Sequence, residues 1–441
     1  MQHMKRPACT LAVSLLLAAI SSAEVPGPIK VSPDGRHFVD RTGAPFFWLG
    51  DTAWPLFAQY SKEQAEGYLT NRAAKGFTVI QGVLAWGLGS GMEQKTPMAN
   101  ALGHKPWLDD DPAKPNPAYF AHVDHLVDFA NRQGLVLAML PTWGYYVKES
   151  PVINAKNARA YGRWLGERYE TKPNILWVNG GDRTPTGFED VFRELAKGLR
   201  EGDAGAHLIT YHPCGWRSSA QFFHDEDWLD FNMIETWTEW SKIHPAVLSD
   251  ALRTPRKPVV LGEGAYEDGP EYPQGPITPL VIRRQAWWTA MAGGFHTYGQ
   301  NQMWRMEPGW DKTFDTPGAA QVCLMRKILT DATWWTLVPD QGAFATGIGS
   351  ERTLNAAMRS ADGKRVLVYL SSPTTVFLHL DKIEAKNAKA TWISPVTGEK
   401  KDGGTFATGN LTGSTFPTGQ TQFFKTPGHW EDAVLLLEGV S

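Results

Sequence analysis

The sequence predicts an α/β fold: a (β/α)8 barrel of the TIM type followed by a small all-β sandwich domain. The first observation is length, because 441 residues exceed one ordinary domain and suit a large barrel with one added module. The second is that strand-like runs alternate with helical segments, which is typical of a parallel sheet. The third is a change after Thr330, where short alternating runs lie between turn signals.

Eight short runs, mostly apolar, predict the barrel strands. Runs of this kind suit parallel strands that are buried on both faces. Eight of them within this length favour a closed barrel over an open sheet. The runs are Phe46–Gly50, Phe77–Gln81, Leu135–Leu140, Asn174–Asn179, His207–His212, Phe231–Glu235, Pro258–Gly262 and Gly294–Tyr298.

Capping residues mark helices between these runs. Ser61 precedes a helix expected over Lys62–Lys75, with Gln64 in the capping-box position. The pairs Asn116-Pro117 and Thr278-Pro279 open two further helices, because proline is favoured in the first helical turn.

The segment between the second and third strands is long and has little periodicity. It runs from Trp86 to Pro115 and is rich in Gly, Pro, Asp and Trp. A long irregular loop at the active-site end of a barrel usually shapes the substrate cleft, and we expect that role here.

The C-terminal third predicts a separate β-sandwich. We place the barrel domain at residues 28–330 and the module at residues 331–441, with Trp334 and Trp335 at the seam. We expect the module to pack on the barrel and support it. Its strand-like runs are Thr353–Met358, Val366–Leu370, Thr375–Leu380, Ala390–Ile393 and Ala433–Leu437.

The N-terminus predicts a secretory signal peptide over residues 1–23. Lys5 and Arg6 precede a short apolar run, Leu11–Ile20, which ends at small residues up to Ala23. We therefore expect a secreted or periplasmic protein with no membrane anchor after cleavage. The run is too short to span a bilayer.

Composition limits the partners. Apolar residues make up 42% and charged residues 20% of the chain, and the net charge is -3, so nucleic acid is not an expected partner. The 19 Trp favour carbohydrate, since their faces stack on sugar rings. Cys214 and Cys323 are expected to be free thiols. No motif implies a cofactor or a metal, and nothing indicates the oligomeric state.

Two carboxylates follow strands that lie opposite each other in an eight-stranded barrel. Asp182 follows the fourth strand and Glu263 follows the seventh, each beside glycine. Active sites of barrel enzymes lie at the carboxyl ends of the strands. Glycoside hydrolysis needs two carboxyl groups across one bond, and we assign Asp182 and Glu263 to that pair. A salt bridge or a loop cap is the alternative for either acid alone.

Other strand ends carry polar or aromatic side chains that predict a substrate-binding ring. A ring of such groups at one end of a barrel is a binding site by default. Among them Glu235 is the rival for a catalytic role, and the histidines could be structural. The predicted binding residues are Asp51, Trp143, His212, Glu235, Trp237, Tyr266, His296 and Tyr298.

Four motifs together resemble glycoside hydrolase family 140, the apiosidase-like family. They are Phe47-Trp-Leu-Gly-Asp51-Thr-Ala-Trp54, Trp177-Val-Asn-Gly-Gly-Asp182, Leu261-Gly-Glu263 and His296-Thr-Tyr298-Gly. The resemblance implies a (β/α)8 catalytic domain over about residues 28 to 330, with Asp182 as acid/base and Glu263 as nucleophile. The segment Trp392–Gly398 resembles a collagen-binding-type β module that often follows such barrels. In the wider clan of barrel hydrolases an Asn-Glu pair follows the fourth strand. This chain has Asp182 there, whose side chain is shorter than that of Glu.

The leading hypothesis is a secreted retaining glycosidase that acts on plant cell-wall polysaccharide, with apiose in pectic (rhamnogalacturonan II) side chains as the candidate sugar. Retention predicts a carboxyl separation of about 5–5.5 Å. Glu263 is expected to be ionised, and Asp182 to be protonated through burial and the nearby Glu263 charge. The alternatives are a glycosidase for another furanoside or a β-linked glycan, and a non-catalytic carbohydrate-binding barrel.

Overall fold

The computed structural model describes residues 24–89, 92–237, 239–269, 275–409 and 420–441. The predicted signal peptide, residues 1–23, lies outside the described residues and stays a prediction. Within the described residues, no helix combines the length and the apolar character that a membrane span requires.

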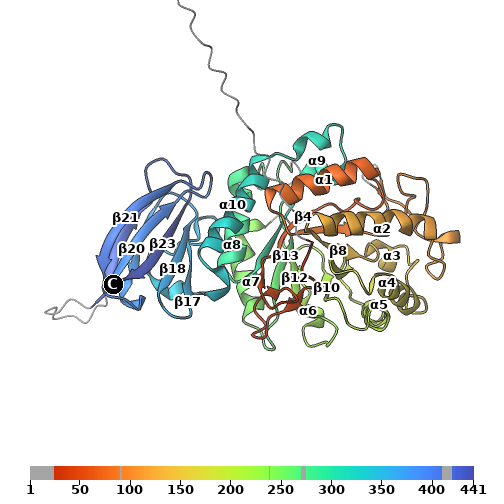
Figure 1. Ribbon diagram of the computed structural model, residues 1–441, viewed down its shortest axis with the longest axis horizontal. Coiled ribbons are helices and arrows are strands. Elements are labelled where there is room, and N and C mark those ends of the chain that lie inside the picture. The colour runs from red at the N-terminus through yellow and green to blue at the C-terminus, as the bar shows by residue number, and fades with distance from the viewer. Residues whose placement is uncertain (1–23, 90–91, 238, 270–274, 410–419) are drawn as a thin grey trace, which may run out of the picture.

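The catalytic part is a nearly closed barrel of parallel strands, as predicted, and all eight predicted runs form strands (Figure 1). Hydrogen bonds from Asp230 N to Ile209 O (2.9 Å) and from Thr210 Oγ1 to Phe231 O (2.6 Å) bring the first and last strands of the sheet together. In sheet order the parallel strands are β10 (Ile209–His212), β9 (Ile175–Gly180), β8 (Val136–Leu140), β5 (Val79–Val83), β4 (Leu49–Thr52), β14 (Phe295–Tyr298), β13 (Val259–Glu263) and β12 (Asn232–Glu235). A short antiparallel strand, β11 (Arg217–Ser218), extends the sheet beside β12.

Helices surround this barrel. The predicted capping box forms, because Ser61 Oγ accepts from Gln64 N (3.2 Å) and Gln64 Oε1 accepts from Ser61 N (2.8 Å).

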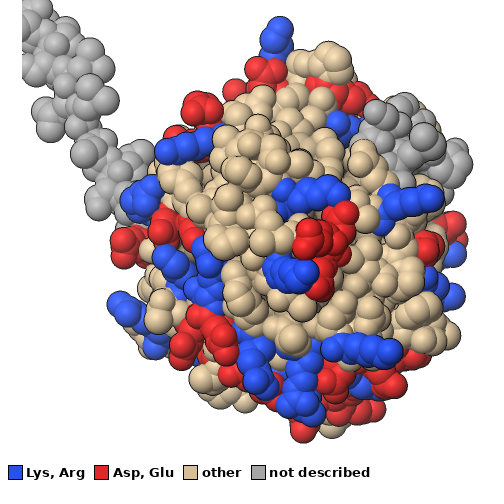
Figure 2. Space-filling model, turned by 90° about the vertical axis from the view of Figure 1, so that its right-hand side faces the viewer, with Lys and Arg blue, Asp and Glu red and all other residues tan. Residues whose placement is uncertain are grey.

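On the face that Figure 2 shows, positive and negative side chains are interspersed. The helices are α1 (Lys62–Lys75), α2 (Pro117–Arg132), α3 (Tyr145–Lys148), α4 (Ala158–Tyr169), α5 (Glu189–Gly202), α6 (Ala220–Phe223), α7 (Ile243–Ala251), α8 (Pro279–Met291), α9 (Asn301–Arg305) and α10 (Pro317–Asp331).

A small antiparallel sheet packs near the start of the barrel. Phe38, on its central strand, contacts the rings of Trp48 (5.8 Å between centroids) and Phe231 (5.2 Å). It therefore extends the barrel core at the end where β4 and β12 begin. Its strands are β1 (Lys30–Val31), β2 (Phe38–Val39) and β3 (Pro45–Phe46).

The C-terminal region is all-β, as predicted, with two antiparallel sheets that enclose one apolar core. The sequence did not reveal four of its strands, which are short or polar. The larger sheet has the order β15 (Leu337–Pro339), β17 (Ala356–Ser360), β18 (Arg365–Leu370), β23 (Ala433–Val440), β20 (Asn387–Ile393) and β21 (Lys400–Ala407). The smaller has β16 (Phe344–Thr346), β19 (Thr375–His379) and β22 (Thr421–Lys425).

The module shares a core with the barrel. Trp334 packs edge-on against Phe47 (5.2 Å between centroids) and Phe295 (5.5 Å). Trp287 of α8 stacks on Tyr369 of the module at 5.3 Å, so this tryptophan belongs to the seam. A continuous apolar cluster spans both parts, so the module packs on the barrel, and its supporting role stays a prediction.

A buried ion pair crosses the seam. Arg283 of α8 binds Asp432 through two hydrogen bonds of 3.0 Å and 2.9 Å, and Tyr369 donates to the same carboxylate (2.9 Å). Arg283 also reaches Glu431 (3.3 Å), which is 65% exposed.

Removing one member of this pair is expected to destabilise the protein. Asp432→Ala leaves the Arg283 charge buried, which typically costs about 3–5 kcal/mol. We expect a clear fall in the melting temperature measured by calorimetry. The matched control is Glu431→Ala, which removes an exposed partner of the same arginine and should change stability by less than about 1 kcal/mol. Equal losses for both variants would contradict a special role for the seam pair.

Candidate active site

Two carboxylates and one imidazole meet at the carboxyl ends of the barrel strands. Glu235 ends β12 and Glu263 ends β13, and the two residues are register partners next to a bulge. His212 ends β10; its Nε2 lies 3.3 Å from Glu263 Oε2 and its Nδ1 lies 3.8 Å from Glu235 Oε2. The imidazole therefore lies next to both carboxylates without a hydrogen bond to either, and its Nδ1 lies 2.9 Å from Pro213 O.

Glu235 is buried more completely than Glu263. The Glu235 side chain is almost completely buried. Burial, followed by the negative charges of Glu263 and Asp182, raises the pKa of Glu235 well above its usual range, although Arg183 acts in the opposite direction. Burial at this position therefore favours the protonated form of Glu235.

The raised pKa of Glu235 has a measurable consequence for stability. A carboxyl whose pKa is raised in the folded state stabilises the fold fully below its unfolded pKa, here about 4.5. That stabilisation is lost as the pH rises from 4.5 through the raised folded pKa. Glu235→Gln carries a permanently neutral side chain of the same shape, so its melting temperature should fall less over this window than that of the wild type. The control is Glu431→Gln, which changes an exposed carboxylate at the seam. Parallel melting curves against pH for Glu235→Gln and wild type would contradict a neutral Glu235.

Asp182 reaches the same histidine from the loop after β9. The backbone is left-handed at Gly180 (φ 86°), Gly181 (φ 112°) and Asp182 (φ 52°). A Cβ on Gly181 would lie 2.6 Å from the Trp143 ring, and one on Gly180 would lie 2.3 Å from His212 O, so both positions require glycine. The turn brings Asp182 N to 3.4 Å from His212 Nδ1.

The Asp182 carboxyl is open to solvent. Its side chain is 46% exposed, and Oδ2 lies 3.4 Å from Arg183 Nη1. The expectation that burial keeps this acid protonated is therefore not supported, because the structure leaves it at the surface of the site. A bound sugar would have to supply that burial.

Aromatic side chains form one wall around His212. The Trp54 ring lies 5.2 Å from the imidazole and 5.5 Å from the ring of Trp143. Trp54 Nε1 donates to the Tyr266 hydroxyl (2.9 Å). Trp86, which begins the long loop predicted to shape the cleft, packs against Trp143 at 5.3 Å. Two of the predicted binding residues, Trp143 and Tyr266, thus belong to this wall.

Trp237 is the exposed aromatic side chain next to Glu235. It is 44% exposed and has a left-handed backbone (φ 41°). A Cβ on Gly215 would make ordinary contacts with Glu235 Oε1 (3.4 Å) and Trp237 Cβ (3.6 Å), so the loop after β10 runs beside both residues. Trp237 is therefore placed to offer a stacking face beside the carboxylates.

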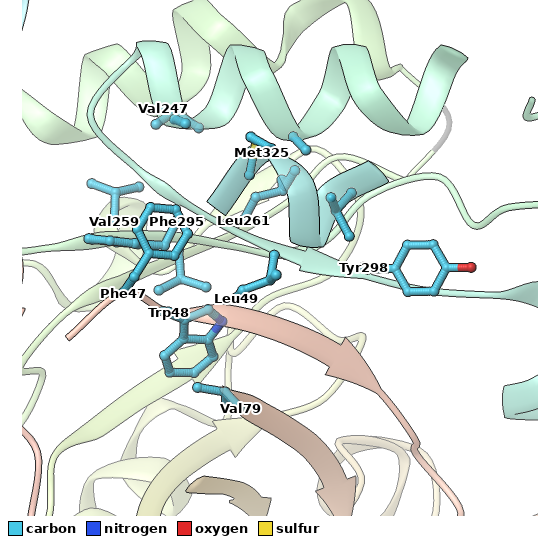
Figure 3. Packing of buried hydrophobic residues seen from close by; sticks show 14 of the residues in the cluster. Phe47, Trp48, Leu49, Val79, Val247, Val259, Leu261, Phe295, Tyr298 and Met325 are labelled. Atoms are coloured by element: carbon cyan, nitrogen blue, oxygen red, sulfur yellow. The ribbon is translucent and has the colours of Figure 1, made fainter. Parts of the chain in front are cut away.

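The structure does not bring Asp51 and Tyr298 to the site. Asp51 is buried in an ion pair with Arg72 of α1 and accepts from Tyr68 (2.7 Å). Tyr298 donates to Glu267 (2.6 Å), whose carboxylate also accepts from Gly318 N at the start of α10 (2.9 Å). Figure 3 shows the Tyr298 ring set apart from Leu49 and Leu261, with its hydroxyl directed away from them. Both side chains join the barrel to its helices, so neither can contact a sugar in the cleft.

His296, like Tyr298, lies away from the site. Side chains alternate along a strand, so His296 lies on the same side of β14 as Tyr298. It is buried, and neither ring nitrogen has a hydrogen-bond partner among the described protein atoms. Burial lowers the pKa of His296 to about 3, so the ring is neutral. A structural histidine, which the sequence left open, is the better description.

One residue of the site was not assigned from the sequence. Trp54 lies inside the first motif, shortly after β4, and that position was the available signal.

One cluster of three side chains could bind a cation together. Among the described residues, the ligand-type atoms of His212, Glu235 and Glu263 all lie within 4.8 Å of one another. A divalent ion there would compete with the proton that Glu235 holds.

Comparisons with known proteins agree with this geometry. A family model described as "Apiosidase-like, catalytic domain" matches residues 32–336. A second, described as "Putative collagen-binding domain of a collagenase", matches residues 338–438. A search of curated proteins gives no match.

Solved structures extend the likeness over 94% of the chain. A crystal structure of a glycoside hydrolase family 5 protein from Bacteroides vulgatus ATCC 8482 is 27% identical with a TM-score of 0.83, and 94% of each chain is covered. A second structure, described as a glycoside hydrolase, is 26% identical with a TM-score of 0.84 and covers 94% of this chain and 97% of its own.

Proposed function

This chain belongs to the apiosidase-like catalytic-domain family and is a glycoside hydrolase, and from that premise we propose a retaining enzyme of the family 140 type that releases apiose from pectic side chains of plant cell walls. The observation that supports catalysis best is the meeting of Asp182, Glu263 and His212 at one end of the barrel. We infer that residues 1–23 direct secretion and that residues 28–330 form the catalytic unit.

In the first step Glu263 is the nucleophile. One carboxylate oxygen attacks the anomeric carbon, and the bond from that carbon to the leaving oxygen breaks. Asp182 transfers its proton to the leaving oxygen, so the aglycone departs as an alcohol. The result is a glycosyl ester on Glu263.

In the second step water replaces the ester. Asp182, now a carboxylate, takes a proton from the water molecule, whose oxygen attacks the anomeric carbon. The ester bond breaks, Glu263 becomes a carboxylate again, and the sugar leaves with its original configuration.

His212 and Glu235 prepare the nucleophile. His212 Nε2 lies 3.3 Å from Glu263 Oε2 without a hydrogen bond, and a small rotation of either side chain would let the imidazole donate to that carboxylate and orient it. A neutral Glu235 avoids a second negative charge against the nucleophile, which would otherwise raise its proton affinity. The rings of Trp54 and Trp143 pack against the imidazole, at 5.2 Å and 6.4 Å between centroids, and restrict its movement.

The sugar is tested by product analysis. Purified protein is incubated with a panel of pectic and hemicellulosic polysaccharides, and released monosaccharides are identified by chromatography and NMR. Free apiose from rhamnogalacturonan II is the expected product. Release of a different sugar would assign another specificity, and no release from any member would favour a non-catalytic barrel.

A further inference from the structure

The small sheet of the C-terminal module has one buried and one exposed face. Val376 and Leu378 of β19 and Phe424 of β22 point into the sandwich core. Because side chains alternate along each strand, the residues between them point outward. Phe377 is 43% exposed and Phe423 is 57% exposed. The outer face thus presents two phenylalanines to solvent.

The register places these two rings side by side. Phe377 and Phe423 are direct partners on adjacent antiparallel strands, and their ring centroids lie 6.3 Å apart at an angle of 52°. The rest of the same face is polar: its rows pair Thr375 with Lys425 and His379 with Thr421, and Thr346 of β16 pairs with Phe377. We call the face made by these seven residues the Phe377–Phe423 platform.

The size and composition of the platform argue against a second copy of the chain. A stable protein interface buries about 800 Å² per partner and has an apolar centre much wider than two rings. On the platform, hydroxyl, ammonium and imidazole groups lie immediately next to the two rings. Exposed aromatic side chains on a sheet favour aggregation. Two of them side by side therefore suggest a binding function that retains them.

We propose that the Phe377–Phe423 platform binds a polysaccharide chain. Adjacent aromatic rings can stack on the apolar C–H faces of successive sugars, and Thr375, Thr421 and Lys425 can donate to sugar hydroxyl or carboxylate oxygens. The same chain carries a glycoside hydrolase barrel, so attachment to the polymer would raise the local concentration of its bonds at the cleft. The proposal depends on the glycosidase class and not on which sugar the barrel releases.

Affinity electrophoresis tests binding. The full chain with Glu263→Gln, which should be unable to cut the polymer, is run in native gels that contain pectin, arabinan, xyloglucan or mannan. At least one polysaccharide should retard it. The added double substitution Phe377→Ala with Phe423→Ala should weaken that binding about tenfold or more, as expected for the loss of two stacking contacts.

Two controls separate stacking from damage to the fold. Val396→Ala removes another exposed apolar side chain of the module, 40% exposed, and should leave retardation unchanged. Replacing both phenylalanines by tryptophan should retain binding, because a larger ring still stacks. Melting temperatures of all variants should stay close to the parent value, since both rings are exposed.

Kinetics give a second readout with wild-type Glu263. The double alanine variant should show a raised KM on the retarding polymer and an unchanged kcat/KM on a small soluble glycoside. Absence of retardation by every polysaccharide, or equal retardation of parent and double alanine variant, would overturn the proposal. So would a parent dimer in light scattering that the double substitution converts to a monomer, since the platform would then bind a second copy. A barrel that releases another sugar would leave the gel result unaffected.

Discussion

Glu263→Gln is expected to lower kcat/KM on polymeric and on small substrates by at least about 10⁴-fold, because no covalent intermediate can form without the nucleophile. The amide has almost the same shape as the carboxylate, so the contact with His212 can persist and the fold should be unaffected. Hydrolysis rates at saturating and subsaturating substrate measure the effect, and the melting temperature checks the fold.

A matched control is Glu66→Gln on α1, which changes the same functional group in an ion pair with His125, away from the cleft. Its activity should equal that of the wild type. The configuration of the first product, followed by NMR, then tests the role itself. Retention is expected. Inversion would remove Glu263 as nucleophile and leave it as the base that activates water.

Asp182→Asn is expected to lower kcat by about 10²–10⁴-fold on natural substrates, the usual contribution of general acid catalysis. The amide cannot protonate the departing oxygen. The loss should become much smaller with an activated phenol as leaving group, since that oxygen needs no proton. A series of aryl glycosides with leaving groups of increasing acidity measures this dependence.

Asp182→Ala adds a second test of the same role. Azide should partly restore turnover, because a small anion can attack the glycosyl ester where the general base is missing, and the product should be a glycosyl azide. Asp190→Asn is the control: this carboxylate is exposed on α5 and pairs with Arg193. An equal loss for all leaving groups, with no azide product, would show that Asp182 binds the substrate and does not transfer a proton.

The fold was predictable because its signals are local. Each barrel strand is a short apolar run, and helix starts such as Ser61 with Gln64 carry their own hydrogen bonds. Two strands of the module, β21 and β22, lack such a run. β21 is held by pairing with β20, which directly precedes it, and β22 by pairing with β19, which lies much earlier in the chain. The partner of β22 lies outside any local sequence window.

The candidate site was predictable only in part. Trp143 follows β8 and His212 ends β10, and both side chains lie at the barrel end that the sequence predicted. Asp51 and Tyr298 lie within the last residues of their strands, where a shift of one residue changes the face. They face the helices, and the sequence could not show this because the strand ends were uncertain by a few residues.

The sequence by itself determined the order of strands and helices, the two carboxylates after the fourth and seventh strands, and the change to an all-β module. The tertiary structure alone decided which carboxyl is buried. Glu235 is enclosed by His212 and by the loop at Gly215, whereas Asp182 stays exposed on its glycine turn. Burial depends on elements that are far apart in the chain, and desolvation raises the pKa of Glu235 through that burial, so this shift could be identified only once the barrel had closed around the side chain.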